Sequence, residues 1–337
     1  MRWPSGASPP WGWGCVSWPR GLWSWREGMP GNGRPGAPTG ACSRSRCAAE
    51  EGLRSEGACQ AGRDSMLKRH DQVRTFYDQD AGDYQWRRWF ASPVAQANYQ
   101  MTREALLEAL APTLDEEILE VGCGPGTWTA VVAPQCRSLT AVDISPHMVE
   151  QARAYVQAAN VQFEVADFVR WEAGRTWDKA FAVRVFEHFE DKALALARFR
   201  DLLRPGGRLV LITKTVPSLW NGRVRLLRLA RRLLGREGAA EQARRAAFWM
   251  QRVHPLRLRR LLADAGFGSI SIVPVILRPP IFARGEDEYP LIGPRWEGPL
   301  LAFSLAMARR VRRMPAWVRL CCTLGSESYL AVGQREG

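Results

Sequence analysis

Short apolar runs alternate with segments of helical periodicity from about residue 101 to the end of the chain. Seven apolar runs predict strands: Ile118–Val121, Leu139–Val142, Val161–Val165, Lys179–Val185, Arg208–Thr213, Ile270–Val275 and Tyr329–Val332. The segments between them predict helices: Thr102–Leu110, Thr127–Ala133, Pro146–Ala159, Asp191–Leu203 and Pro255–Ala265. Strands that alternate with helices are typical of βαβ units with parallel strands. The pattern therefore predicts an α/β fold with one doubly wound, seven-stranded, mostly parallel sheet.

Two long segments, 215–253 and 277–323, interrupt this alternation and are expected to be helical insertions. The first holds 9 Arg and 2 Glu, and residues 304–319 within the second hold 5 Arg and no acid. Most of the formal charge of +13 therefore belongs to the insertions and not to the sheet.

Residues 1–65 follow neither pattern. They hold 6 of the 15 Trp residues, separated by Gly or Pro at almost every step, so no helical or strand period survives. Three interpretations remain open: a disordered arm, an organelle presequence, or sequence upstream of the true start. We favour translation from Met66, which opens a helix-like run, with residues 1–65 disordered if they are made.

The 8 Cys residues are irregularly spaced and form neither a metal-binding nor a disulfide framework. We therefore expect no metal and a reducing compartment, the cytoplasm. The first 30 residues lack the apolar run of a secretory signal, and no stretch approaches the ~18 consecutive apolar residues of a membrane span. We expect a soluble protein or one attached to a membrane surface.

The first predicted strand ends in Gly122, Gly124 and Gly126, directly before a helical run. Glycines at such a turn let the backbone bend sharply and let a ligand lie against the main chain. This arrangement predicts a nucleotide-binding turn. Enzymes that bind NAD carry G-x-G-x-x-G, whereas here the third Gly comes one residue early, giving G-x-G-x-G after Glu120.

With this turn and its further motifs, the chain resembles the class I S-adenosylmethionine-dependent methyltransferases, especially the small-molecule enzymes of the ubiquinone/menaquinone-biosynthesis type. The resemblance runs from about Phe76 to Gln334, and the matching motifs are Glu120–Gly126, Ala141–Ser145, Val165–Phe168, Phe181–His188 and Leu202–Leu209. It implies a Rossmann-like methyltransferase domain over residues 111–337, N-terminal lid helices over residues 66–110, and S-adenosyl-L-methionine as cofactor.

The resemblance also implies roles for two acids. Asp143 would accept hydrogen bonds from the ribose hydroxyls, and Asp167 would bind the adenine amino group with Phe168 packed beside it. Asp143 lies 21 positions after Gly122, the reach from a first βα turn to the tip of the next strand. The expected cofactor site comprises Glu120, Gly122, Cys123, Gly124, Gly126, Asp143, Ile144, Asp167, Phe168, Arg184 and Tyr77.

Arg184 departs from the family pattern, since close relatives often carry an acidic or polar residue at the end of the fourth strand. It could bind an acidic substrate or the cofactor carboxylate, or it could be a strand-end Arg held in a salt bridge. Trp128, where smaller residues are frequent, is expected to cover the cofactor pocket. Tyr77, Tyr84 and Trp86 would be walls of the lid, or pack as ordinary aromatic residues.

The sulfonium of the cofactor is already an activated electrophile, so a general base is needed only for a poor nucleophile such as a hydroxyl. His188, which closes the fourth motif, is the first candidate base, and His254 is the second. For each, a purely structural role is as good an interpretation as a catalytic one.

These features predict methyl transfer to a small, lipophilic or aromatic acceptor by in-line displacement. One alternative is a non-catalytic module that binds the cofactor or a membrane. A basic helix over Leu219–Leu234 and the run Arg309–Arg313 would favour contact with a membrane surface. The other alternative, RNA methylation, is disfavoured because base-directed amino-methyltransferases carry Asp/Asn-Pro-Pro-aromatic where this chain has Arg184–Glu187.

Overall fold

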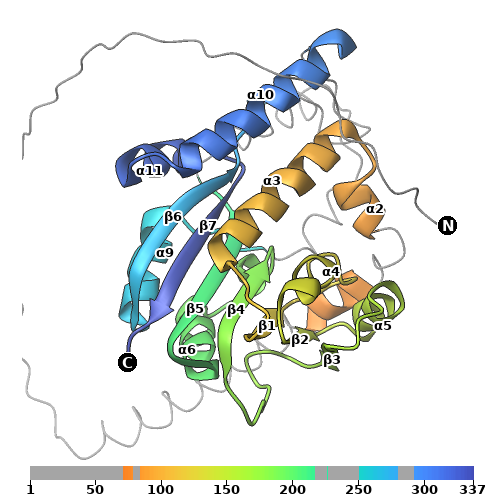
Figure 1. Ribbon diagram of the computed structural model, residues 1–337, viewed down its shortest axis with the longest axis vertical. Coiled ribbons are helices and arrows are strands. Elements are labelled where there is room, and N and C mark those ends of the chain that lie inside the picture. The colour runs from red at the N-terminus through yellow and green to blue at the C-terminus, as the bar shows by residue number, and fades with distance from the viewer. Residues whose placement is uncertain (1–70, 79–83, 217–225, 227–249, 280–291) are drawn as a thin grey trace, which may run out of the picture. The chain divides into compact units, whose positions relative to one another are not determined.

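The computed structural model describes residues 71–78, 84–216, 226, 250–279 and 292–337 (Figure 1). The expected leader 1–65 and nearly all of the insertion 215–253 lie outside the described residues. The strands are β1 Glu117–Val121, β2 Ser138–Asp143, β3 Val161–Val165, β4 Trp177–Val183, β5 Leu203–Lys214, β6 Phe267–Ile276 and β7 Ser328–Arg335. They form one sheet in the order β3-β2-β1-β4-β5-β7-β6. Only β7 is antiparallel to its neighbours, which confirms the mostly parallel α/β fold.

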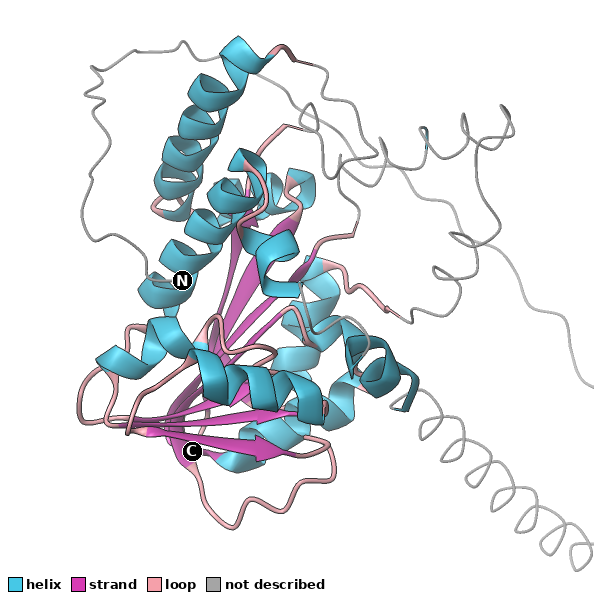
Figure 2. Cartoon of the chain, turned by 90° about the vertical axis from the view of Figure 1, so that its right-hand side faces the viewer, coloured by secondary structure: helices cyan, strands magenta, loops and turns pink. Residues whose placement is uncertain are grey.

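The sheet is buried on both faces, because successive apolar side chains of its central strands enter opposite cores. Leu119 packs in one core with α6 (Lys192–Leu202) and α9 (Pro255–Asp264). Ile118 packs in the other core with α3 (Pro93–Leu110), α5 (Pro146–Tyr155) and α10 (Pro294–Arg312). Figure 2 shows the strands as a single layer between these helices. This double burial explains why the strands appear in the sequence as continuous apolar runs.

The predicted helices exist, but their bounds differ. The second predicted helix is only α4 (Thr129–Val132) followed by the 3-10 turn Ala133–Gln135. The third ends at Tyr155 and not at Ala159, because Asn160 turns the chain toward β3 by donating side-chain hydrogen bonds to the carbonyls of Ala133 (2.8 Å) and Cys136 (3.0 Å). Side-chain caps fix the other starts, as where Asp191 accepts from the backbone N–H of Leu194.

The periodicity gave no bounds for α2 (Tyr84–Trp89), α10 and α11 (Ala316–Gly325), although they fall in the expected lid helices and in or beside the second expected helical insertion. It gave only the second half of α3. Pro299 lies inside α10 and breaks the expected helical pattern. α3, which falls in the segment expected to form a lid, packs instead on the sheet face.

Two arginines of the second basic run form ion pairs with α3. Arg312 is buried and Arg309 is half exposed, and they pair with Glu108 and Glu104 of α3, with Nε to Oε2 distances of 2.9 and 2.8 Å. These contacts tie α10 to α3. Within the described ranges, no helix is long and apolar enough to cross a bilayer.

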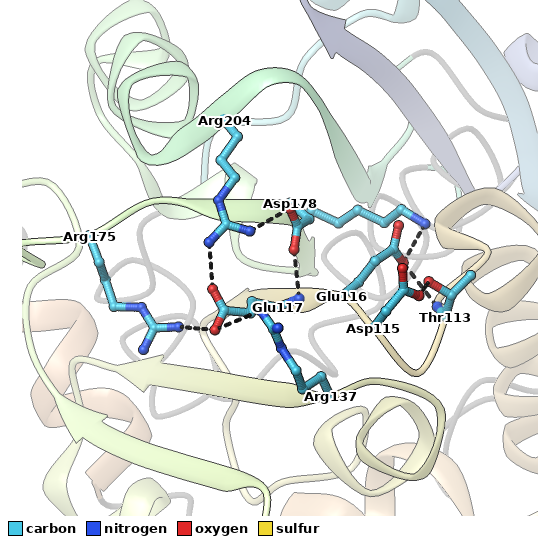
Figure 3. A network of polar contacts seen from close by, with 9 residues as sticks. Thr113, Asp115, Glu116, Glu117, Arg137, Arg175, Asp178 and Arg204 are labelled. Carbon is cyan, nitrogen blue, oxygen red and sulfur yellow. Dashed lines mark hydrogen bonds and ion pairs between the residues drawn. The ribbon is translucent and has the colours of Figure 1, made fainter.

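A polar network closes the amino ends of the central strands (Figure 3). The carboxylate of Asp178 accepts a 2.8 Å hydrogen bond from the backbone N–H of Glu117, and Arg204 bridges Asp178 and Glu117. Arg137 and Arg175 approach the same Glu117 carboxylate at 3.1 and 3.3 Å. Because these contacts fix the start of β1 and β4, the opposite, carboxyl edge of the parallel strands is left for a binding site.

Candidate active site

The turn after β1 needs glycine at three positions for different reasons. All three have positive φ: +73° at Gly122, +51° at Gly124 and +84° at Gly126. A Cβ on Gly122 would lie 2.1 Å from a methyl group of Val185, and one on Gly126 would lie 2.8 Å from a methyl group of Val156. The place where a Cβ on Gly124 would lie is empty. Gly122 and Gly126 therefore permit close packing, whereas Gly124 leaves space for a ligand.

Asp143 ends β2 beside this turn. Its Oδ2 accepts a 2.8 Å hydrogen bond from the backbone N–H of Gly124, and its Oδ1 accepts a 3.0 Å bond from that of Ser145. Burial raises the pKa of Asp143, and the backbone N–H groups of Ser145, Gly124 and Ile144 partly offset that effect. The carboxylate is thus fixed in orientation, and each oxygen keeps a lone pair for a further donor.

A cavity of about 970 Å³, including its open mouth, lies at the carboxyl ends of β1, β2 and β4. Its lining includes most of the residues expected from the sequence: Tyr77, Gly122, Cys123, Gly124, Asp143, Ile144, Asp167, Phe168, Arg184 and His188. It lies where the chain order reverses between β1 and β4, the position at which open α/β sheets bind ligands.

Three expected residues do not line this cavity. Gly126 packs against α5, as described above. Glu120 is buried behind the turn, where its Oε2 accepts a 2.6 Å hydrogen bond from the Thr129 hydroxyl, and burial raises its pKa to about 8. His254 caps α9, since its Nδ1 accepts from the backbone N–H of Leu256 at 3.3 Å. The expectation that His254 is a second base therefore gives way to a structural role.

The remaining walls are apolar and aromatic. Phe168 is buried against Phe199, with ring centroids 4.4 Å apart. Trp128 lines the cavity as expected and stacks on Tyr99 of α3 at 5.3 Å, a partner that the sequence pattern did not identify. Burial raises the pKa of the Cys123 thiol, so this side chain is a neutral wall and not a nucleophile.

Asp167 follows β3 at the same edge. Its Oδ1 accepts a 3.2 Å hydrogen bond from the backbone N–H of Val169, and Arg170 lies 3.9 Å from its Oδ2. Asp143 and Asp167 thus stand on neighbouring strand ends, both lining one cavity.

A segment from before the sheet lines the cavity. Tyr77, in the helical residues 71–78, places its hydroxyl 3.0 Å from Nε2 of His188, although the two residues are 111 positions apart. The next residue, Asp78, accepts a hydrogen bond from the Ser145 hydroxyl and lies 3.4 Å from Nδ1 of His147. Sequence reasoning missed Asp78, whose only signal was its place beside Tyr77. These contacts hold residues 71–78 against the ends of β2 and β4.

Arg184 follows β4 in a left-handed conformation, with φ of +67°, which is rare for a residue other than glycine. Its Nε donates a 2.9 Å hydrogen bond to Oε1 of Glu187, and the Thr213 hydroxyl donates to Oε2 at 2.7 Å. Burial acts to raise the pKa of Glu187, but Arg184, His188 and Thr213 hold it below its usual value. The salt-bridged interpretation of Arg184 is thus present in the structure, and the same side chain also lines the cavity.

A second cavity, of about 710 Å³, adjoins the first. Four residues line both cavities: Tyr77, Tyr84, Arg184 and His188. In the part of the chain that the structure describes, no group of three His, Cys, Asp or Glu side chains could hold a metal ion.

The first cavity suits a nucleoside with a flexible tail. It offers a turn whose backbone is open at Gly124, a fixed carboxylate at Asp143 and apolar walls for a flat ring. Residues 118–207 match the family model described as a methyltransferase domain. This match assigns a methyltransferase domain to residues 118–207.

Known proteins similar to this methyltransferase domain agree with that assignment. An uncharacterized methyltransferase of Mycobacterium tuberculosis is 33% identical over 126 residues, which cover 37% of this chain and 64% of the relative. An O-methyltransferase of Pyrenophora dematioidea is 35% identical over 122 residues, covering 34% of this chain and 45% of the relative. The chain thus spans less than two thirds of the length of these relatives.

The fold has a counterpart among solved structures. The methyltransferase bound to the Haloferax volcanii Trm112 methyltransferase activator superposes with a TM-score of 0.50 and 18% identity, covering 77% of this chain and 98% of that one. This likeness supports the Rossmann-like arrangement of the methyltransferase domain.

Proposed function

We propose that the protein transfers a methyl group from S-adenosylmethionine to a small, lipophilic or aromatic acceptor by in-line displacement. The observation that carries the proposal is the junction of the two cavities: Tyr77, Arg184 and His188 line both. A cofactor held in the first cavity and an acceptor held in the second would meet there. Such an acceptor is in keeping with the resemblance to enzymes of the ubiquinone/menaquinone-biosynthesis type.

When bound, the cofactor supplies an activated methyl group, so the protein has chiefly to bind and orient. In this proposal the second lone pairs of Asp143 accept from the ribose hydroxyls and Asp167 binds the adenine amino group. Phe168 packs beside the base. The lid formed by residues 71–78 excludes water, which strengthens every polar contact inside.

His188 is proposed as the general base for a hydroxyl nucleophile. It lies at the junction, 9% exposed, with Nε2 within hydrogen-bond distance of the Tyr77 hydroxyl. Burial raises the pKa of Tyr77, so the phenol stays protonated and orients the imidazole. Relatives named as O-methyltransferases, from Pyrenophora dematioidea and Penicillium expansum, favour an oxygen acceptor.

A second candidate function is cofactor-dependent chemistry without methyl transfer. A relative from Talaromyces variabilis is named as an S-adenosyl-L-methionine-dependent Diels-Alderase, and it is 36% identical over 141 residues, covering 40% of this chain and 48% of the relative. A cofactor site of this kind can therefore occur in a protein whose named reaction is not methylation.

One experiment separates these functions. The protein is incubated with methyl-labelled S-adenosylmethionine and a panel of phenols, quinols and hydroxy acids, and both labelled product and S-adenosylhomocysteine are measured. Stoichiometric formation of the two supports methyl transfer. Cofactor binding by calorimetry, without S-adenosylhomocysteine from any acceptor or from a cell extract, favours the second candidate. Absence of cofactor binding contradicts both.

The proposed base has its own control. Tyr77→Phe should lower kcat about 10-fold or more and shift the pH profile of kcat, because the imidazole loses its orienting partner. An unchanged kcat and pH profile would assign the Tyr77–His188 contact to packing alone.

A further inference from the structure

We propose that the second cavity binds an anionic group of the acceptor, a carboxylate or a phosphate, beside the position of methyl transfer. The inference deepens the proposed function and rests on it, because it names the chemical class of the acceptor that the junction receives.

The side chains that line the second cavity are mostly positively charged. Four cationic side chains, Arg87, Arg88, Arg184 and Lys214, line the second cavity, against the one carboxylate of Glu187. They come from different parts of the fold: α2, the turn after β4 and the end of β5. Since these segments are distant in the sequence, only the folded chain brings their charges together.

The carboxylate of Glu187 pairs with only one member of this cluster, Arg184. Both oxygens of Glu187 are already used, one by Nε of Arg184 and the other by the hydroxyl of Thr213. The other carboxylate that acts on Arg184, Glu327, accepts a 2.9 Å hydrogen bond from Arg278. Glu187 therefore leaves the positive charges of Arg88 and Lys214 in the described lining without a pairing from it.

Two guanidinium nitrogens point to a missing acceptor. Arg184 is only 9% exposed, and its Nη1 has no hydrogen-bond partner among the described residues. The buried Nε of Arg88 likewise has none in that part of the chain. A buried N–H without an acceptor is destabilising, and more so on a charged group, so an anion between these side chains would remove the penalty.

The left-handed backbone of Arg184 supports a binding role. A residue with φ of +67° that is not glycine persists only where the surroundings hold it, and such conformations cluster at ligand sites. Here the conformation lets Nε meet Glu187 while the side chain still lines both cavities.

The other residues that line the second cavity indicate the kind of molecule to which the anionic group belongs. Phe76, Tyr84 and Met250 contribute apolar and aromatic wall. His188 stands at the junction, where a nucleophilic hydroxyl would be deprotonated. The combination fits a hydroxy-substituted aromatic or alkyl acid, or the corresponding phosphate ester, with its anionic end toward Arg88 and Lys214.

The test measures binding without requiring the true acceptor. The full chain, saturated with S-adenosylhomocysteine, is titrated with benzoate, with phenyl phosphate and with neutral benzamide, which has the shape of benzoate. We expect the anions to bind at least 10-fold more tightly than benzamide, and the tighter anion identifies carboxylate or phosphate as the preferred group. Equal binding of the three compounds, or no binding of any, overturns the inference.

Variants locate the effect. Lys214→Gln and Arg88→Gln, whose side chains line only the second cavity, should each weaken the preferred anion about 5- to 10-fold and leave S-adenosylhomocysteine affinity and Tm unchanged. Arg260→Gln, on the exposed surface of α9, removes one charge elsewhere and should change nothing. An equal loss in Arg260→Gln would show general electrostatic attraction and overturn the site.

The two proposals fail in different ways. If S-adenosylhomocysteine does not bind, the proposed function fails, and titration of the cofactor-free protein still decides the anion site. If S-adenosylhomocysteine binds and the anions show no preference, only the inference about the acceptor fails.

Discussion

Substituting Ala for Gly122 and for Gly124 should separate stability from cofactor binding, although the two residues share one turn. Both have positive φ, a conformation that costs an L-residue about 1–2 kcal/mol. Gly122→Ala also forces a Cβ to within 2.1 Å of a Val185 methyl group, and such overpacking costs about 1–3 kcal/mol more. Gly124→Ala meets nothing within 4 Å.

We therefore expect Gly122→Ala to lose about 2–5 kcal/mol of unfolding free energy, or roughly 4–20 °C in Tm, and Gly124→Ala about 1–2 kcal/mol. The order reverses for cofactor affinity. The new methyl group of Gly124→Ala occupies space in the first cavity, so S-adenosylhomocysteine should bind at least 10-fold more weakly to it than to the wild type.

Denaturant unfolding and calorimetric titration measure the two quantities on the same samples. Adding Val185→Ala to Gly122→Ala should recover part of the lost stability, since the colliding methyl groups are removed. The reasoning is refuted if Gly124→Ala is the less stable variant, or if it binds S-adenosylhomocysteine as well as the wild type does.

Three further predictions concern acids and their partners. Asp143→Asn should weaken cofactor binding about 10-fold in calorimetry. Each carboxylate oxygen of Asp143 accepts a backbone N–H, and the substitution replaces one of these oxygens with an NH₂ donor. Unchanged affinity would remove Asp143 from the site. Arg204→Ala should cost only about 1 kcal/mol in denaturant unfolding, because its contact to Asp178 is partly exposed and screened, and should leave cofactor affinity unchanged. Burial raises the pKa of Glu120 from 4.5 to about 8, so the neutral form is favoured in the folded state. Relative to Glu120→Gln, the wild type should lose stability as the pH rises from 4.5 to about 8 and then level off; a difference that is constant with pH contradicts this assignment.

The sequence by itself determined the central part of the fold and the cofactor turn. Strands buried on both faces produce apolar runs that are visible without a structure. The order of the strands, with β7 antiparallel between β5 and β6, came only from the structure. Gly122, Gly124 and Asp143 could be predicted because they stand at strand ends, where the local backbone already requires their residue types.

The tertiary structure decided what depends on segments distant in the chain. His188 and His254 are both single histidines near predicted elements, and only packing shows that one contacts Tyr77 at the junction while the other caps a helix. The sequence shows Arg309 and Arg312 only as part of a basic run, and the structure shows that carboxylates of α3 pair with both. Periodicity reports which face of an element is buried, but not which element covers it. The cationic second cavity, assembled from α2 and the ends of β4 and β5, was therefore beyond prediction from the sequence pattern.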